Sequence, residues 1–378
     1  MTSRPAVRIF VNSFVWLIAF VLTCRIVHEV LPLPNMPQVH PKLEYFAKHK
    51  DEIDAVFVGS SRTRHGIMPQ VFDQTLATRN VPMRSLNLGV NGMTPPEEFW
   101  VIKHVIAQNS NSLKWVFIEL AGLRSTVHAE TMRGLYFRDF EETLWSARKI
   151  WQFAQRTKSQ PLDLKVSRKW RKRVRNLPPA FVELVRFTEN FWPHAAAFAR
   201  HQTNLGRALY REPAGGENDP PIEQTLGYCP ESKAMSNPAE LRKFENSLAE
   251  VKNPTRITHD PLGEKAFSQL LARVRRKKLT PICFLTPTVR HGDFFAPRPP
   301  NERIFAFTDP TEFAQFYQPA LRIDFDHLND AGALEFTRLF ANRFADFLEE
   351  KSLPSHIGAT LEQRNEKRDV TAAVQDPR

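Results

Sequence analysis

Cysteine is scarce in this chain, which has 378 residues and only three cysteines, Cys24, Cys229 and Cys283. No two of them form a closely spaced pair, the histidines are scattered, and the His-Glu-x-x-His zinc pattern is absent. Neither a Walker loop nor a dinucleotide fingerprint follows the first expected strand. The sequence therefore predicts no metal site and no cofactor. Cys229 and Cys283 could form a disulfide only if the fold brings them together, and Cys283 is expected to be a buried free thiol.

Acidic residues are outnumbered by basic ones, 41 to 52, so the formal net charge is +11. Such an excess suits an acidic partner, a phospholipid surface or nucleic acid, and charge alone does not choose among them. Hydrophobic residues make up 42% of the chain, which is ample for a large core. The composition is that of a globular protein.

Long apolar runs are also rare, and the main one lies near the start, over residues 9–24. It is uncharged, follows Arg4 and Arg8, and reaches membrane-spanning length if it continues to Leu31. We expect residues 1–31 to form a signal anchor, a single transmembrane helix in the cell inner membrane with the rest of the chain in the periplasm. A cleaved signal peptide and a buried amphipathic helix are the alternatives. An exported location argues against nucleic acid as a partner.

Strand-like and helix-like segments alternate after a proline-rich stretch, residues 32–43, which is expected to be a stiff linker. The alternation predicts an α/β fold with a doubly wound parallel sheet, built from residues 44–123 and 261–352. The expected strands are 54–59, 83–89, 113–120, 282–285 and 304–308, and the expected helices are 69–78, 94–108, 261–278 and 328–349.

The alternation is interrupted by residues 124–260, which contain no convincing pair of strands and are dense in lysine, arginine and tryptophan. We interpret them as a basic helical insertion. Its basic face is either simply solvated or a surface for an anionic glycan, lipid headgroups or a membrane partner. Residues 353–378 are polar and are expected to be a disordered tail.

Two short motifs at opposite ends of the α/β segments carry residue types suited to nucleophilic catalysis. GSSR, residues 59–62, begins at the last residue of the first expected strand. RIDFDHLND, residues 322–330, leads into the final expected helix. In the second motif Asp324 and His327 are three residues apart, so the carboxylate can reach Nδ1 of the imidazole and leave Nε2 for a serine. Both motifs also have a non-catalytic interpretation. GSSR could be a tight turn that caps the next helix, and DHLND could simply be the start of the final helix.

The order of these motifs resembles that of the SGNH/GDSL hydrolase superfamily. The resemblance rests on strand-Gly-x-Ser, on Asn-x-Gly-x-x-Gly in SLNLGVNG after the second strand, and on Asp-x-x-His before the last helix. GSSR combined with DHLN-x-x-G-A is closer to the membrane-anchored branch, whose members work beside membrane-bound O-acyltransferases in polysaccharide acetylation. It implies a flavodoxin-like, three-layer α/β/α fold.

Carried over by motif, the resemblance makes Ser61 the nucleophile, His327 the general base and Asp324 its orienting carboxylate. Ser60 is the second choice for the nucleophile, and Asp326 is the alternative orienting residue. The resemblance also implies an oxyanion hole.

The oxyanion hole implied by the resemblance uses the backbone N–H groups of Ser61 and Gly92. The third block departs from the family, because Leu123 stands where many members carry an asparagine donor. Either Asn91 or Arg62 substitutes for that donor, or catalysis is weak or lost.

These motifs and the anchor together lead us to expect a membrane-anchored, extracytoplasmic O-acyltransferase that acetylates an exopolysaccharide or cell-wall glycan. An esterase or deacetylase with the same triad is one alternative. A non-catalytic protein that binds glycan or assists assembly is the other. The expected partners are a polysaccharide or other acyl-ester substrate, a membrane-bound O-acyltransferase, and the membrane itself.

Overall fold

The computed structural model describes residues 4–30, 38–93, 95–121, 137, 220–250, 261–289 and 302–352. Most of the expected insertion, the first part of the expected linker and the expected tail lie outside these residues. The predictions made for those segments therefore stay predictions.

A five-stranded parallel sheet forms the centre of the fold, in the order β2-β1-β3-β4-β5. β1 therefore lies between β2 and β3, and the chain moves first to one side of β1 and then to the other. In sheets of this kind the carboxyl ends of the strands diverge at such a reversal and leave room for a site. The strands are β1 (Ala55–Val58), β2 (Ser85–Asn87), β3 (Trp115–Glu119), β4 (Thr280–Leu285) and β5 (Ile304–Ala306). The predicted α/β fold with a parallel sheet is present.

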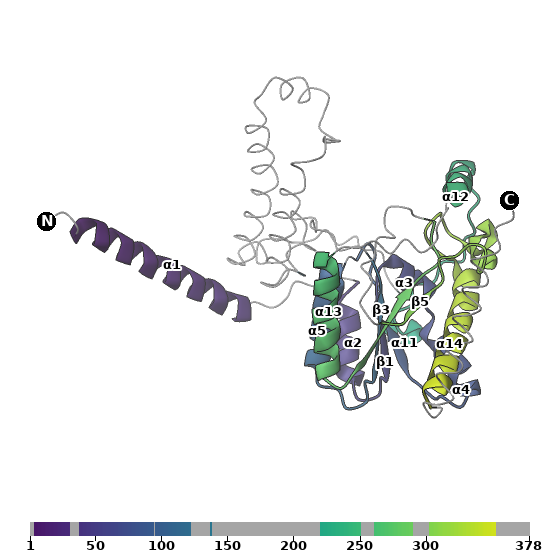
Figure 1. The fold of residues 1–378 in the computed structure, drawn as a ribbon, viewed down its shortest axis with the longest axis horizontal. Helices are drawn as coiled ribbons and strands as arrows, with labels where there is room; N and C mark the ends of the chain where they lie inside the picture. Colours follow the sequence, from purple (N-terminus) through teal and green to yellow (C-terminus); the bar gives the residue numbers. More distant parts are fainter. Residues whose placement is uncertain are drawn as a thin grey trace, which may run out of the picture.

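Helices cover both faces of the sheet, as Figure 1 shows. One face carries α2 (His40–His49), α5 (Pro95–Ala107) and α13 (Pro261–Arg276), and the other carries α4 (Pro69–Thr78) and α14 (Asp330–Ser352). Because side chains of a strand alternate between faces, β1 sends Val56 and Val58 into one core and Ala55 and Phe57 into the other. Because both faces of β1 are covered by helices, its four residues are all apolar and all buried.

A cluster of phenylalanines holds α14 on the sheet. Its central ring is Phe340, which is fully buried. The rings within 6.0 Å of Phe340, centroid to centroid, are those of Phe57, Phe72, Phe117, Phe284, Phe305, Phe307 and Phe336. Burial of one such side chain contributes about 1.5–3 kcal/mol. The contacts set the position of α14, and thereby of the loop that precedes it at the carboxyl edge of the sheet.

Several described elements were not expected from the sequence. They are α2, α3 (Ser61–Gly66) and two 3-10 turns, η1 (Ala314–Tyr317) and η2 (Pro319–Leu321). Two further helices, α11 (Ile222–Thr225) and α12 (Pro238–Glu250), lie within residues 124–260, which were expected to be helical. α2 begins within the range expected to be linker, and its buried Lys42 donates 2.7 Å hydrogen bonds to the carbonyls of Gly89 and Gly227.

Residues 220–236, which lie in the range assigned to the insertion, run across the α/β layers. The Cys229 N–H donates to the Arg64 carbonyl in α3 at 3.0 Å, and the Met235 N–H donates to the Arg322 carbonyl at 2.7 Å. This segment therefore contacts both the helix that follows β1 and the loop that precedes α14.

The N-terminal helix α1 (Arg4–Val30) presents its large apolar side chains to the surroundings. The exposed ones include Phe10 and Trp16, at 73% and 76%. Figure 1 draws α1 apart from the layered elements. Among the described residues, none of the helices combines the length and the apolar character required to cross a membrane.

Candidate active site

The turn after β1 is tightly packed against the end of β3. Ser60 is the N-cap of α3, and its hydroxyl accepts a 3.3 Å hydrogen bond from the Arg62 N–H. Gly59 is required here, since a Cβ atom at this position would overlap the Thr63 hydroxyl and the Glu119 carboxylate. The turn therefore places Ser61, the first residue of α3, at the carboxyl edge of the sheet.

Glu119, the last residue of β3, binds this turn through its fully buried carboxylate. It accepts from four donors, which are the Ser60 N–H (2.8 Å), the Ser60 hydroxyl (3.0 Å), the Arg62 Nε–H (2.7 Å) and the Thr63 hydroxyl (2.6 Å). These bonds compensate the cost of burying a charge. Glu119 was not among the site residues predicted from the sequence. The available signal was an acidic residue at the end of an otherwise apolar strand.

Asn87 holds the other end of α3. Its side-chain amide donates to the carbonyls of Thr63 and Ile67, both at 2.8 Å, and its side-chain oxygen accepts from the Gly89 N–H at 2.8 Å. All of these groups are buried. Asn87, the first asparagine of SLNLGVNG, therefore joins β2 to the helix that carries Ser61.

The loop that precedes α14 is organised around Arg322, whose side chain is fully buried. Burial lowers the pKa of its guanidinium from the ordinary value, against the influence of nearby Tyr317 and carboxylates. The guanidinium lies 5.4 Å from the centre of the Phe244 ring. It donates to the backbone carbonyls of Phe316 (2.8 Å), Asp324 (3.2 Å) and Phe325 (3.1 Å). The backbone between residues 316 and 325 is thus held by one side chain.

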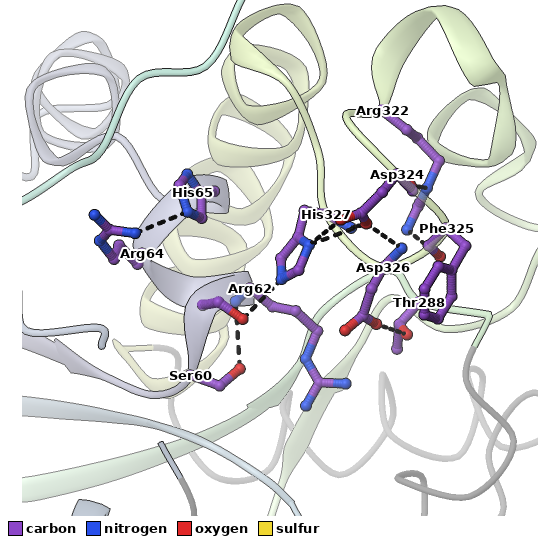
Figure 2. Close-up of polar contacts among 11 residues, drawn as sticks. Ser60, Arg62, Arg64, His65, Thr288, Arg322, Asp324, Phe325, Asp326 and His327 are labelled. Carbon is purple, nitrogen blue, oxygen red and sulfur yellow. Dashed lines mark hydrogen bonds and ion pairs between the residues drawn. The ribbon is translucent and has the colours of Figure 1, made fainter. Parts of the chain in front are cut away.

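The structure brings Ser61, His327 and Asp324 together, as the motifs predict. Nε2 of His327 lies 2.7 Å from Oγ of Ser61, across 266 positions of sequence. Nδ1 of His327 lies 2.9 and 3.0 Å from the two carboxylate oxygens of Asp324, as Figure 2 shows. The Asp324 carboxylate also accepts from the backbone N–H groups of Asp326 (2.7 Å) and His327 (2.9 Å).

The protonation states follow from these contacts. Burial by itself raises the pKa of the Asp324 carboxyl, but the hydrogen bonds and charge of His327 and the two backbone donors outweigh it and hold this pKa well below its usual range. An ionised Asp324 accepts a proton-bearing Nδ1, so Nε2 is left with a lone pair directed at the Ser61 hydroxyl. This arrangement can accept the proton of Ser61.

The alternative residues have other partners. The Ser60 hydroxyl is bound to Glu119, and the buried Asp326 carboxylate accepts a 2.7 Å hydrogen bond from the Thr288 hydroxyl. Nδ1 of His327 contacts both carboxylate oxygens of Asp324, so Asp324 rather than Asp326 is the carboxylate that orients this ring.

The expected oxyanion donors are the N–H of Ser61 itself and that of Gly92, in the loop that follows β2. The Val90 N–H donates to the Gly59 carbonyl at 3.1 Å, which places the residues after Val90 beside the turn. Gly92 is exposed and has a φ of 62°, a conformation that glycine adopts readily. Neither Ser61 nor Gly92 donates its backbone N–H to another described residue.

The other donors considered for this hole have different surroundings. The Asn91 backbone N–H donates to the Gln38 side chain at 3.1 Å, and its side chain is half-buried. Arg62 forms an ion pair with Glu119. Leu123 lies outside the described residues. A role for Asn91 in the oxyanion hole stays a prediction.

The described part of the chain contains neither a metal-binding cluster nor a pair of bonded cysteines. There, no three histidine, cysteine or acidic side chains are grouped closely enough to hold a metal ion. Cys229 and Cys283 are both free thiols, and burial raises the pKa of Cys283 to about 12.

No protein-family model matches this chain, and no curated protein matches it. The resemblance to the SGNH superfamily therefore rests on the sequence motifs alone.

Proposed function

We propose that this protein is a membrane-anchored, extracytoplasmic SGNH-like O-acyltransferase that uses Ser61, His327 and Asp324 to acetylate a glycan. The observation that supports this proposal is the continuous set of hydrogen bonds from the Asp324 carboxylate through the imidazole to the Ser61 hydroxyl. Three side chains in this order are suited to nucleophilic acyl transfer.

The proposed reaction has two halves. In the first, Nε2 of His327 takes the proton of Ser61 while Oγ attacks the acyl carbonyl of the donor ester. The donor C–O bond then breaks, and the imidazolium returns the proton to the leaving oxygen. In the second half a sugar hydroxyl loses its proton to Nε2 and attacks the acyl carbonyl. The bond from this carbon to Oγ of Ser61 then breaks, and the imidazolium returns the proton to Oγ, which restores the free Ser61 hydroxyl.

Negative charge develops on the carbonyl oxygen in each half of the reaction. The backbone N–H groups of Ser61 and Gly92 are the donors that we assign to this oxygen. One such donor stabilises the transition state by about 3 kcal/mol. The Asp324 carboxylate stabilises the positive charge on His327 and keeps its ring oriented.

Membrane attachment is part of the proposal and is assigned to α1. Apolar side chains are exposed along this helix, and such a surface favours transfer into lipid. Extraction of cell membranes with alkaline carbonate tests this assignment. The full chain should remain in the pellet, and a variant that lacks residues 1–37 should be released. Release of the full chain would refute membrane insertion.

The triad is tested on the detergent-solubilised full chain with a fluorophosphonate probe, which reacts with activated serines. The wild-type protein and Ser60→Ala should be labelled, whereas Ser61→Ala and His327→Ala should not. Ser60→Ala is the matched control because its hydroxyl is bound to Glu119 rather than to His327. Labelling that survives in Ser61→Ala would refute the catalytic assignment.

The acceptor is tested with an aryl acetate as donor, with and without an oligosaccharide. An acyltransferase should form acetylated oligosaccharide, and its release of the aryl alcohol should accelerate when the sugar is added. An esterase would form acetate at a rate independent of the sugar. A non-catalytic protein would form neither product and would not be labelled by the probe. A membrane-bound O-acyltransferase as the source of the acyl group is the partner that we infer for the cell.

A further inference from the structure

The guanidinium of Arg62 lies beside the proposed nucleophile and is held there by a buried carboxylate. Arg62 directly follows Ser61 in α3, and its Nε lies 2.7 Å from a carboxylate oxygen of Glu119. The two side chains are 10% and 1% exposed. An ion pair this well buried is screened only weakly by solvent, so it fixes the position of the guanidinium.

This ion pair lies on the side of Ser61 opposite to the loop that carries Gly92. β1 has β2 on one side and β3 on the other. The loop with Gly92 follows β2 and is tied to the turn by the bond from Val90 to Gly59, whereas Glu119 ends β3. In the view of Figure 2 the Arg62 side chain leaves the turn and its guanidinium lies between Ser60 and Asp326, below the His327 ring.

The geometry of an arginine suits two tasks at once. Its guanidinium carries five N–H donors in one plane. Glu119 engages the donor on Nε, and the other four are on the two Nη atoms. A guanidinium anchored through Nε also carries N–H donors on both Nη atoms, and such donors can bind an oxyanion.

A second carboxyl group nearby does not cancel this positive charge. Glu98 in the first turn of α5 is fully buried, and neither of its side-chain oxygens has a hydrogen-bond partner in the described part of the chain. Burial raises the pKa of Glu98 well above its usual range, and the Glu119 carboxylate raises it further, against the influence of Arg62. Glu98 is therefore neutral. Of these two acidic residues, only Glu119 carries a negative charge that compensates the positive charge of Arg62.

We propose that Arg62 is a further catalytic residue, which donates an Nη–H hydrogen bond to the oxyanion formed at the acyl carbonyl, and that Glu119 is the residue that positions it. This inference rests on the acyl transfer proposed above. The oxyanion would then have donors from Ser61 itself, from Gly92 on the β2 side and from Arg62 on the β3 side. No proton is transferred, because the guanidinium stays charged throughout.

The test measures kcat and KM of Arg62→Ala for an aryl acetate, with the full chain in detergent. Loss of one oxyanion donor should lower kcat by about 100-fold, with KM changed by less than about 3-fold. Addition of methylguanidinium chloride should restore part of the kcat of Arg62→Ala and none of that of Ser61→Ala. A merely structural role for Arg62 would not produce this rescue. Glu119→Gln should also lower kcat, because the guanidinium loses its anchor.

Two further variants keep the test decisive. Arg62→Met retains the aliphatic stem and is measured in the same way if Arg62→Ala does not fold. Glu98→Gln is the matched control, since it replaces a neutral acid by a neutral amide of similar shape and should retain the wild-type kcat.

The outcomes separate this inference from the proposed function. If Arg62→Ala and Arg62→Met keep the wild-type kcat while Ser61→Ala is inactive, the role of Arg62 is refuted and the acyl transfer stands. A folded Arg62→Ala that is slow and is not rescued by methylguanidinium also refutes it. Absence of turnover and of probe labelling in the wild-type protein would instead refute the proposed function.

Discussion

Replacement of Asp324 by asparagine isolates the effect of this carboxylate on the tautomer of His327. In the wild-type protein the carboxylate accepts from Nδ1 and from the backbone N–H groups of Asp326 and His327. An asparagine can keep its oxygen on the two backbone donors and direct its NH₂ group at Nδ1. The ring then carries its proton on Nε2, where it donates to the Ser61 hydroxyl and can no longer accept a proton from it.

The expected loss of rate and of stability in Asp324→Asn follows from the interactions that this substitution removes and from those that it retains. The wrong tautomer and the missing negative charge should slow acylation of Ser61 by about 10³–10⁴-fold, equivalent to about 4–5.5 kcal/mol of transition-state stabilisation. The two backbone hydrogen bonds are retained, so the free energy of unfolding should fall by only about 1 kcal/mol at neutral pH.

The pH dependence of stability gives a second measure. Because the folded state depresses the pKa of Asp324, its contribution to stability is complete above the unfolded-state pKa and is lost as the pH falls through the folded-state pKa. The difference in unfolding free energy between the wild-type protein and Asp324→Asn should therefore be largest near neutral pH and should shrink in acid.

The assay is the rate of fluorophosphonate labelling of Ser61, combined with urea unfolding followed by circular dichroism. Asp326→Asn is the matched control, because its carboxylate accepts from the Thr288 hydroxyl and the variant should be labelled within about 5-fold of the wild-type rate, since less than 1 kcal/mol is lost. A folded Asp324→Asn protein that is labelled less than 10-fold more slowly than wild type would refute the proposed role of Asp324, as would an equal loss in Asp326→Asn.

Three further substitutions test the turn before Ser61, the buried carboxyl of Asp73 in α4, and the phenylalanine cluster that contacts α14. Gly59→Ala should lower the free energy of unfolding by about 1–3 kcal/mol in urea and slow the labelling of Ser61, because the new methyl group overlaps Thr63 and Glu119; unchanged values would contradict the close approach. Burial raises the pKa of Asp73 to about 6, so the contribution of this carboxyl to stability should decline by about 3 kcal/mol as the pH rises from about 4 through 6. In urea titrations at several pH values Asp73→Asn should therefore lack this part of the wild-type pH dependence, and an unchanged slope would refute the shift. Phe340→Ala should lower the free energy of unfolding by about 3–5 kcal/mol, measured in urea, and a loss below 1 kcal/mol would show that the phenylalanine cluster does not hold α14.

Local features of the sequence determined most of the secondary structure. A proline at the first helical position marked the start of the helix expected over residues 69–78, and α4 has these bounds. The apolar run after Asp54 predicted the first strand of the sheet, which the structure places at Ala55–Val58. The spacing of Asp324 and His327 predicted their contact, because residues three apart on a loop can meet without help from the rest of the chain.

Other elements were missed because their signals are not local. α3 is six residues long and contains five polar residues and a glycine, so no apolar periodicity marks it. It is held by Glu119 and Asn87, which come from neighbouring strands. Arg322 likewise has no sequence pattern that predicts complete burial, and its three carbonyl partners come from turns that only the folded chain assembles.

The sequence by itself determined the alternation of strands and helices, both motifs, and the pairing of Asp324 with His327. Only the tertiary structure decided that Nε2 of His327 contacts Ser61 rather than Ser60, because the hydroxyl of Ser60 is bound to Glu119. The physical reason is that this contact joins two distant parts of the chain. Its geometry depends on packing between the sheet and α14, which involves many side chains at once and leaves no mark on either motif.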